Sequence, residues 1–148
     1  MRVLGIEIAG SNVQMILLKG TAKIFTIDIL SPSKLPLPPD PEEVNRLLAL
    51  KKQVYDLLKS NSVESIGIIR ADPGSSPLRA KVECVIQLAA ADASVPCKLV
   101  AAQTASAALK RKIGDLAGDA CLQLVQQLAP AYLRKAALCA WCVHNDKQ

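Results

Sequence analysis

The chain has 148 residues, of which 51% are apolar, so it can bury one hydrophobic core, and we expect residues 1–148 to form a single domain. Its 18 Lys and Arg against 13 Asp and Glu give a net charge of +5, which favours a polyanionic partner. The sequence contains no apolar stretch long enough to span a bilayer and no signal-peptide pattern, so we expect a cytoplasmic protein without a membrane partner.

The first thirty residues predict three antiparallel strands. Val3–Ile8 and Val13–Lys19 are apolar runs on either side of Ala9-Gly10-Ser11-Asn12, in which Gly and Asn accept the positive φ of a tight hairpin. Lys23–Leu30 alternates between two sets of side chains, which is the pattern of a half-exposed strand. Residues 31–41 contain five prolines and are expected to form a rigid loop.

The remainder predicts helices that alternate with short strands. Asp40 is expected to cap a helix that begins at Pro41. The later segments are a strand at Glu64–Ala71, a helix at Arg79–Ala91, a strand at Cys97–Ala102, and helical stretches at Ala105–Lys112, Asp115–Leu128 and Ala131–Val143. This order predicts an α/β RNase H-like domain with a mixed five-stranded sheet, antiparallel first three strands and flanking helices.

Glu7 is the one acid in the first apolar strand. Burying an isolated carboxylate is costly, so this side chain is expected either to be paired with a cation or to act in a functional site.

Three stretches carry a resemblance to a known family. Gly5-Ile6-Glu7 matches the place where RuvC-type Holliday junction resolvases carry their first metal-binding acid. Lys81–Ala90, Lys98–Ala102 and Leu109–Gly114 look like the helix, strand and basic turn that follow in those proteins. The chain most closely resembles a short bacterial RuvC-like family of the RNase H-like superfamily, one without a settled activity. The resemblance implies an RNase H-like fold and relatedness to nucleases.

The departures from the resolvase pattern matter as much as the matches. Resolvases have a second acid at the end of the fourth strand, where this chain has Arg70, and a closing pair of acids where it has Tyr132-Leu-Arg-Lys135. Two-metal cleavage needs several converging carboxylates. We therefore expect a non-catalytic or catalytically reduced domain without a bound metal or other cofactor, and we predict an ion pair between Glu7 and Arg70.

An alternative hypothesis keeps the enzyme activity. Glu7, Asp72 and Glu83 are the acids that could together form a catalytic site, and a resolvase-like nuclease of this kind would need Mg²⁺ or Mn²⁺. Asp72 also suits a turn before Pro73, and Glu83 also suits a helix-surface interaction with Gln87.

A basic surface is predicted at the carboxyl ends of the parallel strands, where open α/β sheets bind ligands. The residues expected there are Arg70, Arg79, Lys81, Lys110, Arg111, Lys112, Arg134 and Lys135. Such a surface fits structured DNA or RNA, or another phosphate-bearing partner, although runs of charge also occur on faces that are simply solvated.

A third hypothesis is a protein-interaction scaffold or homodimer, because the Ala-rich C-terminal helix suits close packing. Cys139-Ala-Trp-Cys142 has the spacing of half a zinc or redox site, but the sequence lacks a second such pair, so core packing is favoured. The chain is also too short for the two domains that actin-like ATPases close around a nucleotide.

Overall fold

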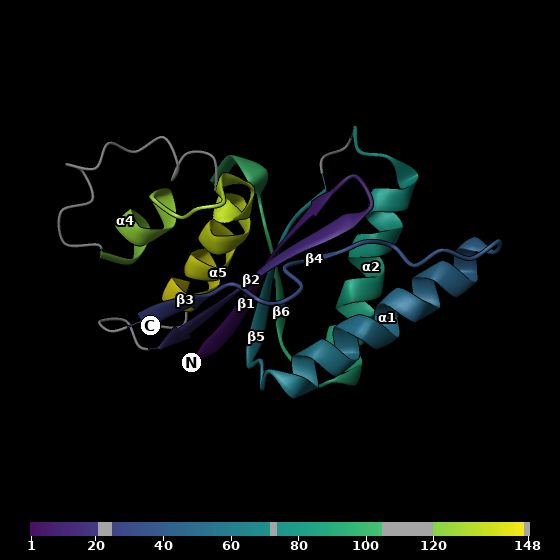
Figure 1. The fold of residues 1–148 in the computed structure, drawn as a ribbon, viewed down its shortest axis with the longest axis horizontal. Coiled ribbons are helices and arrows are strands. Elements are labelled where there is room, and N and C mark those ends of the chain that lie inside the picture. Colours follow the sequence, from purple (N-terminus) through teal and green to yellow (C-terminus); the bar gives the residue numbers. More distant parts are fainter. Residues whose placement is uncertain (21–24, 72–73, 105–119, 147–148) are drawn as a thin grey trace.

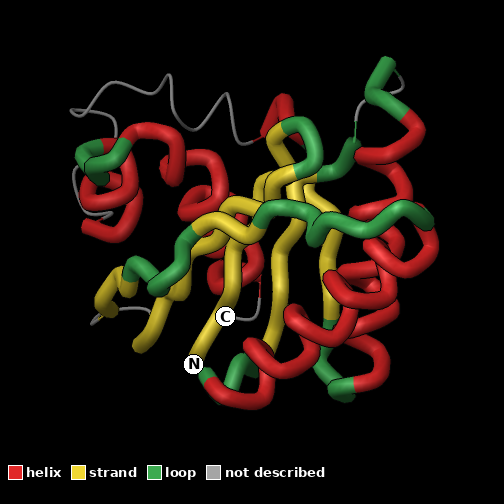
Figure 2. The backbone as a smooth tube through the Cα atoms, turned by 45° about the vertical axis from the view of Figure 1, so that its right-hand side comes forward, coloured by secondary structure: helices red, strands yellow, loops and turns green. Residues whose placement is uncertain are grey.

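The computed structural model describes residues 1–20, 25–71, 74–104 and 120–146. One sheet lies between helices on both of its faces (Figures 1 and 2). The strands are β1 (Arg2–Ala9), β2 (Asn12–Gly20), β3 (Phe25–Asp28), β4 (Lys34–Leu35), β5 (Ser65–Ile69) and β6 (Cys97–Val100). The helices are α1 (Glu43–Ser60), α2 (Pro77–Asp92), α4 (Ala120–Gln126), the 3-10 helix η2 (Ala131–Leu133) and α5 (Arg134–Asp146). Among these described residues, no helix is both long and apolar enough to cross a membrane.

The sheet has the order β3-β2-β1-β5-β6, and β4 pairs with β2 beside this path. The central strand β1 pairs antiparallel with β2 and parallel with β5. The predicted α/β class and the antiparallel arrangement of the first three strands are therefore confirmed. The predicted number of five strands is wrong, because Lys34 and Leu35 pair with β2 as a sixth strand. A two-residue strand among prolines has no alternation that a sequence pattern could reveal.

Several helix boundaries differ from the sequence predictions, and α2 begins at Pro77 rather than Arg79. The first helix begins at Glu43 rather than Pro41, and its N-cap residue is Glu42. Asp40 instead accepts hydrogen bonds from the Glu42 backbone N–H (2.9 Å) and the Asn45 side chain (3.3 Å), so it orders the turn before the helix. The predicted C-terminal helix is divided into η2 and α5.

The helix expected at residues 105–112 lies outside the described residues. So does the first part of the helix expected at 115–128, whose described part is α4.

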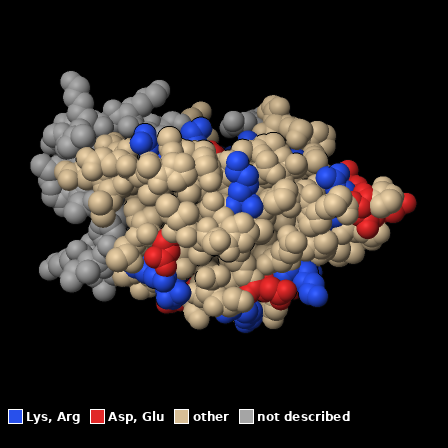
Figure 3. All heavy atoms as spheres, viewed as in Figure 1, with Lys and Arg blue, Asp and Glu red and all other residues tan. Residues whose placement is uncertain are grey.

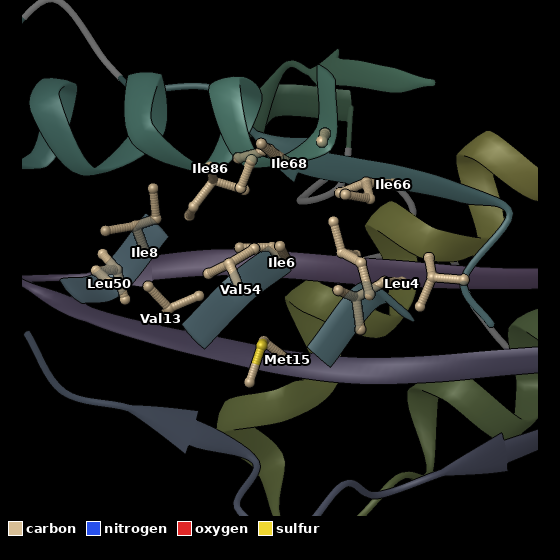
Figure 4. Packing of buried hydrophobic residues seen from close by; sticks show 14 of the residues in the cluster. Leu4, Ile6, Ile8, Val13, Met15, Leu50, Val54, Ile66, Ile68 and Ile86 are labelled. Atoms are coloured by element: carbon tan, nitrogen blue, oxygen red, sulfur yellow. The ribbon is translucent and has the colours of Figure 1, made fainter. Parts of the chain in front are cut away.

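Two hydrophobic clusters lie on opposite faces of the sheet, because successive side chains of a strand point to opposite sides. On one face, Leu4, Ile6 and Ile8 pack against residues of α1 and α2 such as Val54 and Ile86 (Figure 4). On the other face, the buried run 136–140 of α5 packs against side chains of β1, β2 and β5. The alanines of α5 thus pack inside the molecule and do not supply the dimer surface that the sequence suggested.

Glycines let α5 approach the sheet backbone closely. Gly5 of β1 and Gly67 of β5 lie side by side in register, and both face α5. A Cβ atom at Gly5 would lie 1.9 Å from the Ala136 carbonyl oxygen, and one at Gly67 would lie 2.9 Å from the Cys139 Sγ. This close approach fixes the position of α5, and therefore of its first residues, over the end of β1.

Candidate nucleic-acid interface

A row of three polar side chains crosses the sheet on the face that α5 covers. Glu7 of β1 lies directly opposite Gln14 of β2, and Gln14 lies directly opposite Lys34 of β4. Directly opposed residues point to the same face, and Glu7 shares its face with Gly5, two residues earlier. We refer to Glu7, Gln14 and Lys34 as the polar row.

The N-terminal end of the last helical segment lies over the polar row. The Lys135 Nζ is 3.9 Å from the Glu7 Oε2, and the Lys34 Nζ lies 4.7 Å from the centre of the Tyr132 ring. The Tyr132 hydroxyl forms a 3.2 Å hydrogen bond with the Ser33 Oγ. Tyr132 and Lys135 therefore connect this segment to β4 and β1, which lie on either side of β2.

Two opposing effects act on the Glu7 carboxyl, which is 18% exposed. Burial raises its pKa above the ordinary 4.5, and this effect outweighs the positive charges of Lys135 and Arg79, which lower the pKa. The two cations therefore only partly compensate for the loss of water around this carboxylate.

The predicted ion pair between Glu7 and Arg70 is not formed. Ile69 packs in the cluster on the α5 face, whereas Ile68 packs in the cluster on the face of α1 and α2. Because successive side chains of an extended chain point to opposite faces of the sheet, the exposed Arg70 lies on the same face as Ile68, opposite to Glu7. The prediction was wrong in its partner, because the cation that reaches Glu7 comes from α5 rather than from the neighbouring strand.

Arg79 lies in the first turn of α2, at the same edge of the sheet as the start of α5 (Figure 1). Its side chain donates to the Ser75 Oγ (3.1 Å), and its backbone N–H donates to the Ser76 Oγ (3.3 Å), which caps the helix. The buried Nε atom of Arg79 has no hydrogen-bond partner among the described residues. Arg79 therefore adds positive charge near Glu7 without forming a direct ion pair within the described ranges.

Glu83 lies on α2, is only 8% exposed, and accepts a 3.0 Å hydrogen bond from the Ala71 backbone N–H. It thus joins α2 to the chain that follows β5. Asp72 lies outside the described residues, so the proposed catalytic set of Glu7, Asp72 and Glu83 stays a prediction. Within the part of the chain that the structure describes, no three His, Cys, Asp or Glu side chains are grouped to hold a metal ion.

The described side chains around Glu7 do not fit a two-metal site. Such a site needs converging carboxylates, whereas Glu7 is flanked by an amide at Gln14 and by the ammonium of Lys135. The ammonium lies where it would repel a divalent cation that approached the Glu7 carboxylate. Glu7 is therefore a carboxylate whose negative charge is balanced by the Lys135 ammonium, and Arg79 adds further positive charge nearby.

Two other residues predicted for the basic surface, Lys81 and Arg134, contact groups other than Glu7. Lys81 forms an ion pair with Glu43 of α1, and the Arg134 Nε donates to the Leu128 carbonyl at 2.8 Å. Lys110, Arg111 and Lys112 lie outside the described residues. In Figure 3, Lys and Arg side chains are visible along the upper edge, in the middle and along the lower side of the molecule, whereas most visible Asp and Glu side chains lie at its right-hand end and lower side.

Gln14, Ser33 and Lys34 belong to this group of polar side chains but were not among the residues predicted from the sequence. Gln14 did carry a signal, since it is the one polar residue inside an apolar strand and the hairpin places it opposite Glu7. Lys34 and Ser33 carried none, because their position depends on the pairing of β4 with β2.

The cysteine pair of α5 agrees with core packing. Cys139 is fully buried, its Sγ lies close to the Gly67 backbone, and burial raises the pKa of its thiol.

Removing the Glu83 carboxylate should destabilise the protein moderately. In Glu83→Ala the Ala71 N–H loses its acceptor, and we expect the free energy of unfolding to fall by about 1 kcal/mol. Glu83→Gln keeps an acceptor oxygen and should lose less. Urea unfolding followed by circular dichroism measures both, and equal losses in the two variants would contradict a role for this hydrogen bond.

Known proteins share this architecture. The structure is similar to that of Thermus thermophilus RuvC, with a TM-score of 0.68 and 16% identity over 95% of this chain and 91% of that chain. It is also similar to T. thermophilus RuvC in complex with a Holliday junction substrate, with a TM-score of 0.66 and 15% identity over 95% and 90% of the two chains. For the yeast mitochondrial Holliday junction resolvase Ydc2 the TM-score is 0.57 and the identity 10%, over 94% of this chain and 77% of that one.

At these identities the similarity shows the fold, which is the RNase H-like fold of RuvC. No curated protein matches the sequence. Residues 1–136 match the model of a family described as "Protein of unknown function (DUF3010)". Because this match covers most of the chain, we conclude that the protein belongs to the DUF3010 family.

Proposed function

We propose that this protein binds structured nucleic acid through the phosphate backbone, as a catalytically reduced RNase H-like domain. The observation that carries the proposal is the position of the Lys135 ammonium, 3.9 Å from the Glu7 carboxylate. The resemblance to resolvases puts an acid where this chain has Lys135, so a metal ligand of the resolvases corresponds here to a fixed cation.

The location of the cations supports the proposal. Lys135 lies at the start of α5 and Arg79 at the start of α2, and both helices begin at the edge where the parallel strands end (Figure 1). Open α/β sheets bind ligands at this edge. The net charge of +5 favours a polyanion, and phosphate contacts would position a nucleic acid without reading its sequence.

The structural relatives give the class of nucleic acid to test first. One of the similar RuvC structures is a complex with a Holliday junction substrate. We therefore propose branched DNA as the preferred partner, with duplex DNA and RNA as weaker ones.

Fluorescence anisotropy with labelled four-way junction, duplex and single-stranded DNA tests the proposal. We expect the junction to bind most tightly, with an affinity that falls linearly on a log–log plot against salt concentration. The variant Lys110→Ala/Arg111→Ala/Lys112→Ala should bind more weakly, and its salt slope should be smaller by roughly one for each phosphate that the variant no longer binds. Lys52→Ala, which changes an exposed residue of α1, is the control and should bind like the wild type.

Two results would contradict the proposal. Wild-type protein that binds none of these nucleic acids would exclude the function. Cleavage of the labelled junction in Mg²⁺ or Mn²⁺ that is lost in Glu7→Gln would instead support the nuclease alternative, and the same loss in Asp72→Asn and Glu83→Gln would assign it to all three acids.

A further inference from the structure

The cation that neutralises Glu7 keeps donors for another group. The Lys135 Nζ is 3.9 Å from the Glu7 Oε2, which is longer than a hydrogen bond, and the Lys135 side chain is 47% exposed. Among the described residues, the Lys135 ammonium donates no hydrogen bond. It therefore compensates the charge of Glu7 through space while its N–H groups remain available to a ligand.

A second cation is held at the other end of the polar row. The exposed Lys34 lies over the face of the Tyr132 ring, which attracts its ammonium. The adjacent hydroxyls of Tyr132 and Ser33 share one hydrogen bond, so one of the two hydroxyl protons remains free to donate elsewhere. Lys34 of β4, Ser33 before it and Tyr132 of η2 thus form one group of hydrogen-bond donors.

Between these two groups lies a buried amide. Gln14 is only 6% exposed and points to the same face as Glu7 and Lys34. Within the described ranges no hydrogen bond to its side-chain amide is seen, and the amide atoms are not among the fully enclosed polar atoms that lack a partner. The amide therefore keeps some access to solvent and can both donate and accept hydrogen bonds with a ligand at this face.

The charges of this group match one phosphodiester. Two ammonium groups and one carboxylate sum to one positive charge, and a phosphodiester carries one negative charge. Arg79 adds further positive potential at Glu7.

We propose that one phosphodiester group of the bound nucleic acid lies between Lys34 and Lys135, beside Tyr132 and Gln14, and that no divalent cation takes part in its binding. This inference rests on the proposed function and specifies its central contact. It differs from metal-assisted binding because the positive charge comes from side chains of the protein rather than from a bound ion.

Binding of a labelled four-way junction, measured at one fixed ionic strength with either EDTA or Mg²⁺, tests the inference. We expect the wild-type affinity to be the same in both buffers. Lys34→Gln and Lys135→Gln should each weaken binding about tenfold, and each should reduce the salt slope by about one. Tyr132→Phe keeps the ring over Lys34 and should weaken binding less than either lysine change. Lys52→Gln is the control, and thermal melts confirm that every variant is folded.

The outcomes separate this phosphodiester site from the general function. Junction binding that is abolished by EDTA, or that is unchanged in Lys34→Gln/Lys135→Gln, would overturn the phosphodiester site while leaving nucleic-acid binding in place. Wild-type protein that binds no nucleic acid in either buffer would overturn both proposals.

Discussion

Gly5→Ala should lower the free energy of unfolding by about 3 kcal/mol or more, which is a large fraction of the stability of a small domain. The new Cβ would lie 1.9 Å from the Ala136 carbonyl oxygen and 2.9 Å from the Ala140 Cβ. The first of these atoms belongs to the helix backbone, so α5 must move away from β1. The lower chain entropy of the unfolded alanine variant offsets only about 0.4–1 kcal/mol of this cost.

Gly74→Ala is the matched control for this substitution. A Cβ at Gly74 would have no atom within 4 Å, so its free energy of unfolding should stay within about 0.5 kcal/mol of the wild type. Urea unfolding followed by circular dichroism gives both values. Equal midpoints for the two alanine variants would show that α5 does not lie against β1 as described.

The same Gly5→Ala substitution should also weaken nucleic-acid binding, because Lys135 directly precedes Ala136. If α5 moves outward, the ammonium moves away from Glu7 and from the polar row. Gly67→Ala should cost less, since its two nearest contacts are side chains, of Val143 and Cys139, and the helix backbone is no closer than 3.0 Å, at the Cys139 carbonyl oxygen.

Lys135→Asp should lower the free energy of unfolding at neutral pH by about 2 kcal/mol. Two charges 4 Å apart interact by about 4 kcal/mol at an effective dielectric constant of 20, and solvent around the half-exposed Lys135 reduces this to about 1 kcal/mol. The substitution removes that attraction and adds a repulsion of similar size. Lys52→Asp makes the same change in net charge on α1 and should have a much smaller effect.

The destabilisation in Lys135→Asp should depend on pH in a defined direction. Burial already raises the pKa of Glu7 above 4.5, and a second carboxylate would raise it further. An acid whose pKa is raised on folding binds more protons in the folded state, so stability falls as pH rises through that range. The destabilisation should therefore be small well below pH 4.5, where Glu7 is mostly protonated in both states, and should grow toward neutral pH.

Divalent cations provide a second measurement on the same variant. Two neighbouring carboxylates without a cation can ligate Mn²⁺, so millimolar MnCl₂ should raise the melting temperature of Lys135→Asp. The wild type should show no such rise, because its ammonium repels the metal ion. An identical pH profile for Lys135→Asp and Lys52→Asp would show that Lys135 does not act on Glu7.

The docking of α5 underlies both the stability of the domain and the proposed binding surface. The glycines of β1 and β5 set the distance of α5 from the sheet, and that distance brings Lys135 within reach of Glu7. A substitution in the packed interface and one in the charged group should thus both alter the same binding surface.

The sequence by itself determined the fold class and the location of the unusual acid. The apolar runs on either side of Gly10 and Ser11 predicted the first hairpin, and the alternation of helices and strands predicted the parallel part of the sheet. Glu7 stood out because a carboxylate within an apolar strand is costly to bury. These properties follow from local patterns of hydrophobicity, which the chain carries independently of its tertiary structure.

The tertiary structure alone decided the partners of Glu7. Sequence spacing gave no reason to prefer Lys135 over Arg70, because the choice depends on which face of the sheet each residue occupies and on where α5 docks. The pairing of Lys34 with Gln14 likewise depends on a two-residue strand within a proline-rich segment. Contacts between residues far apart in sequence are set by the packing of whole elements, and no local periodicity encodes them.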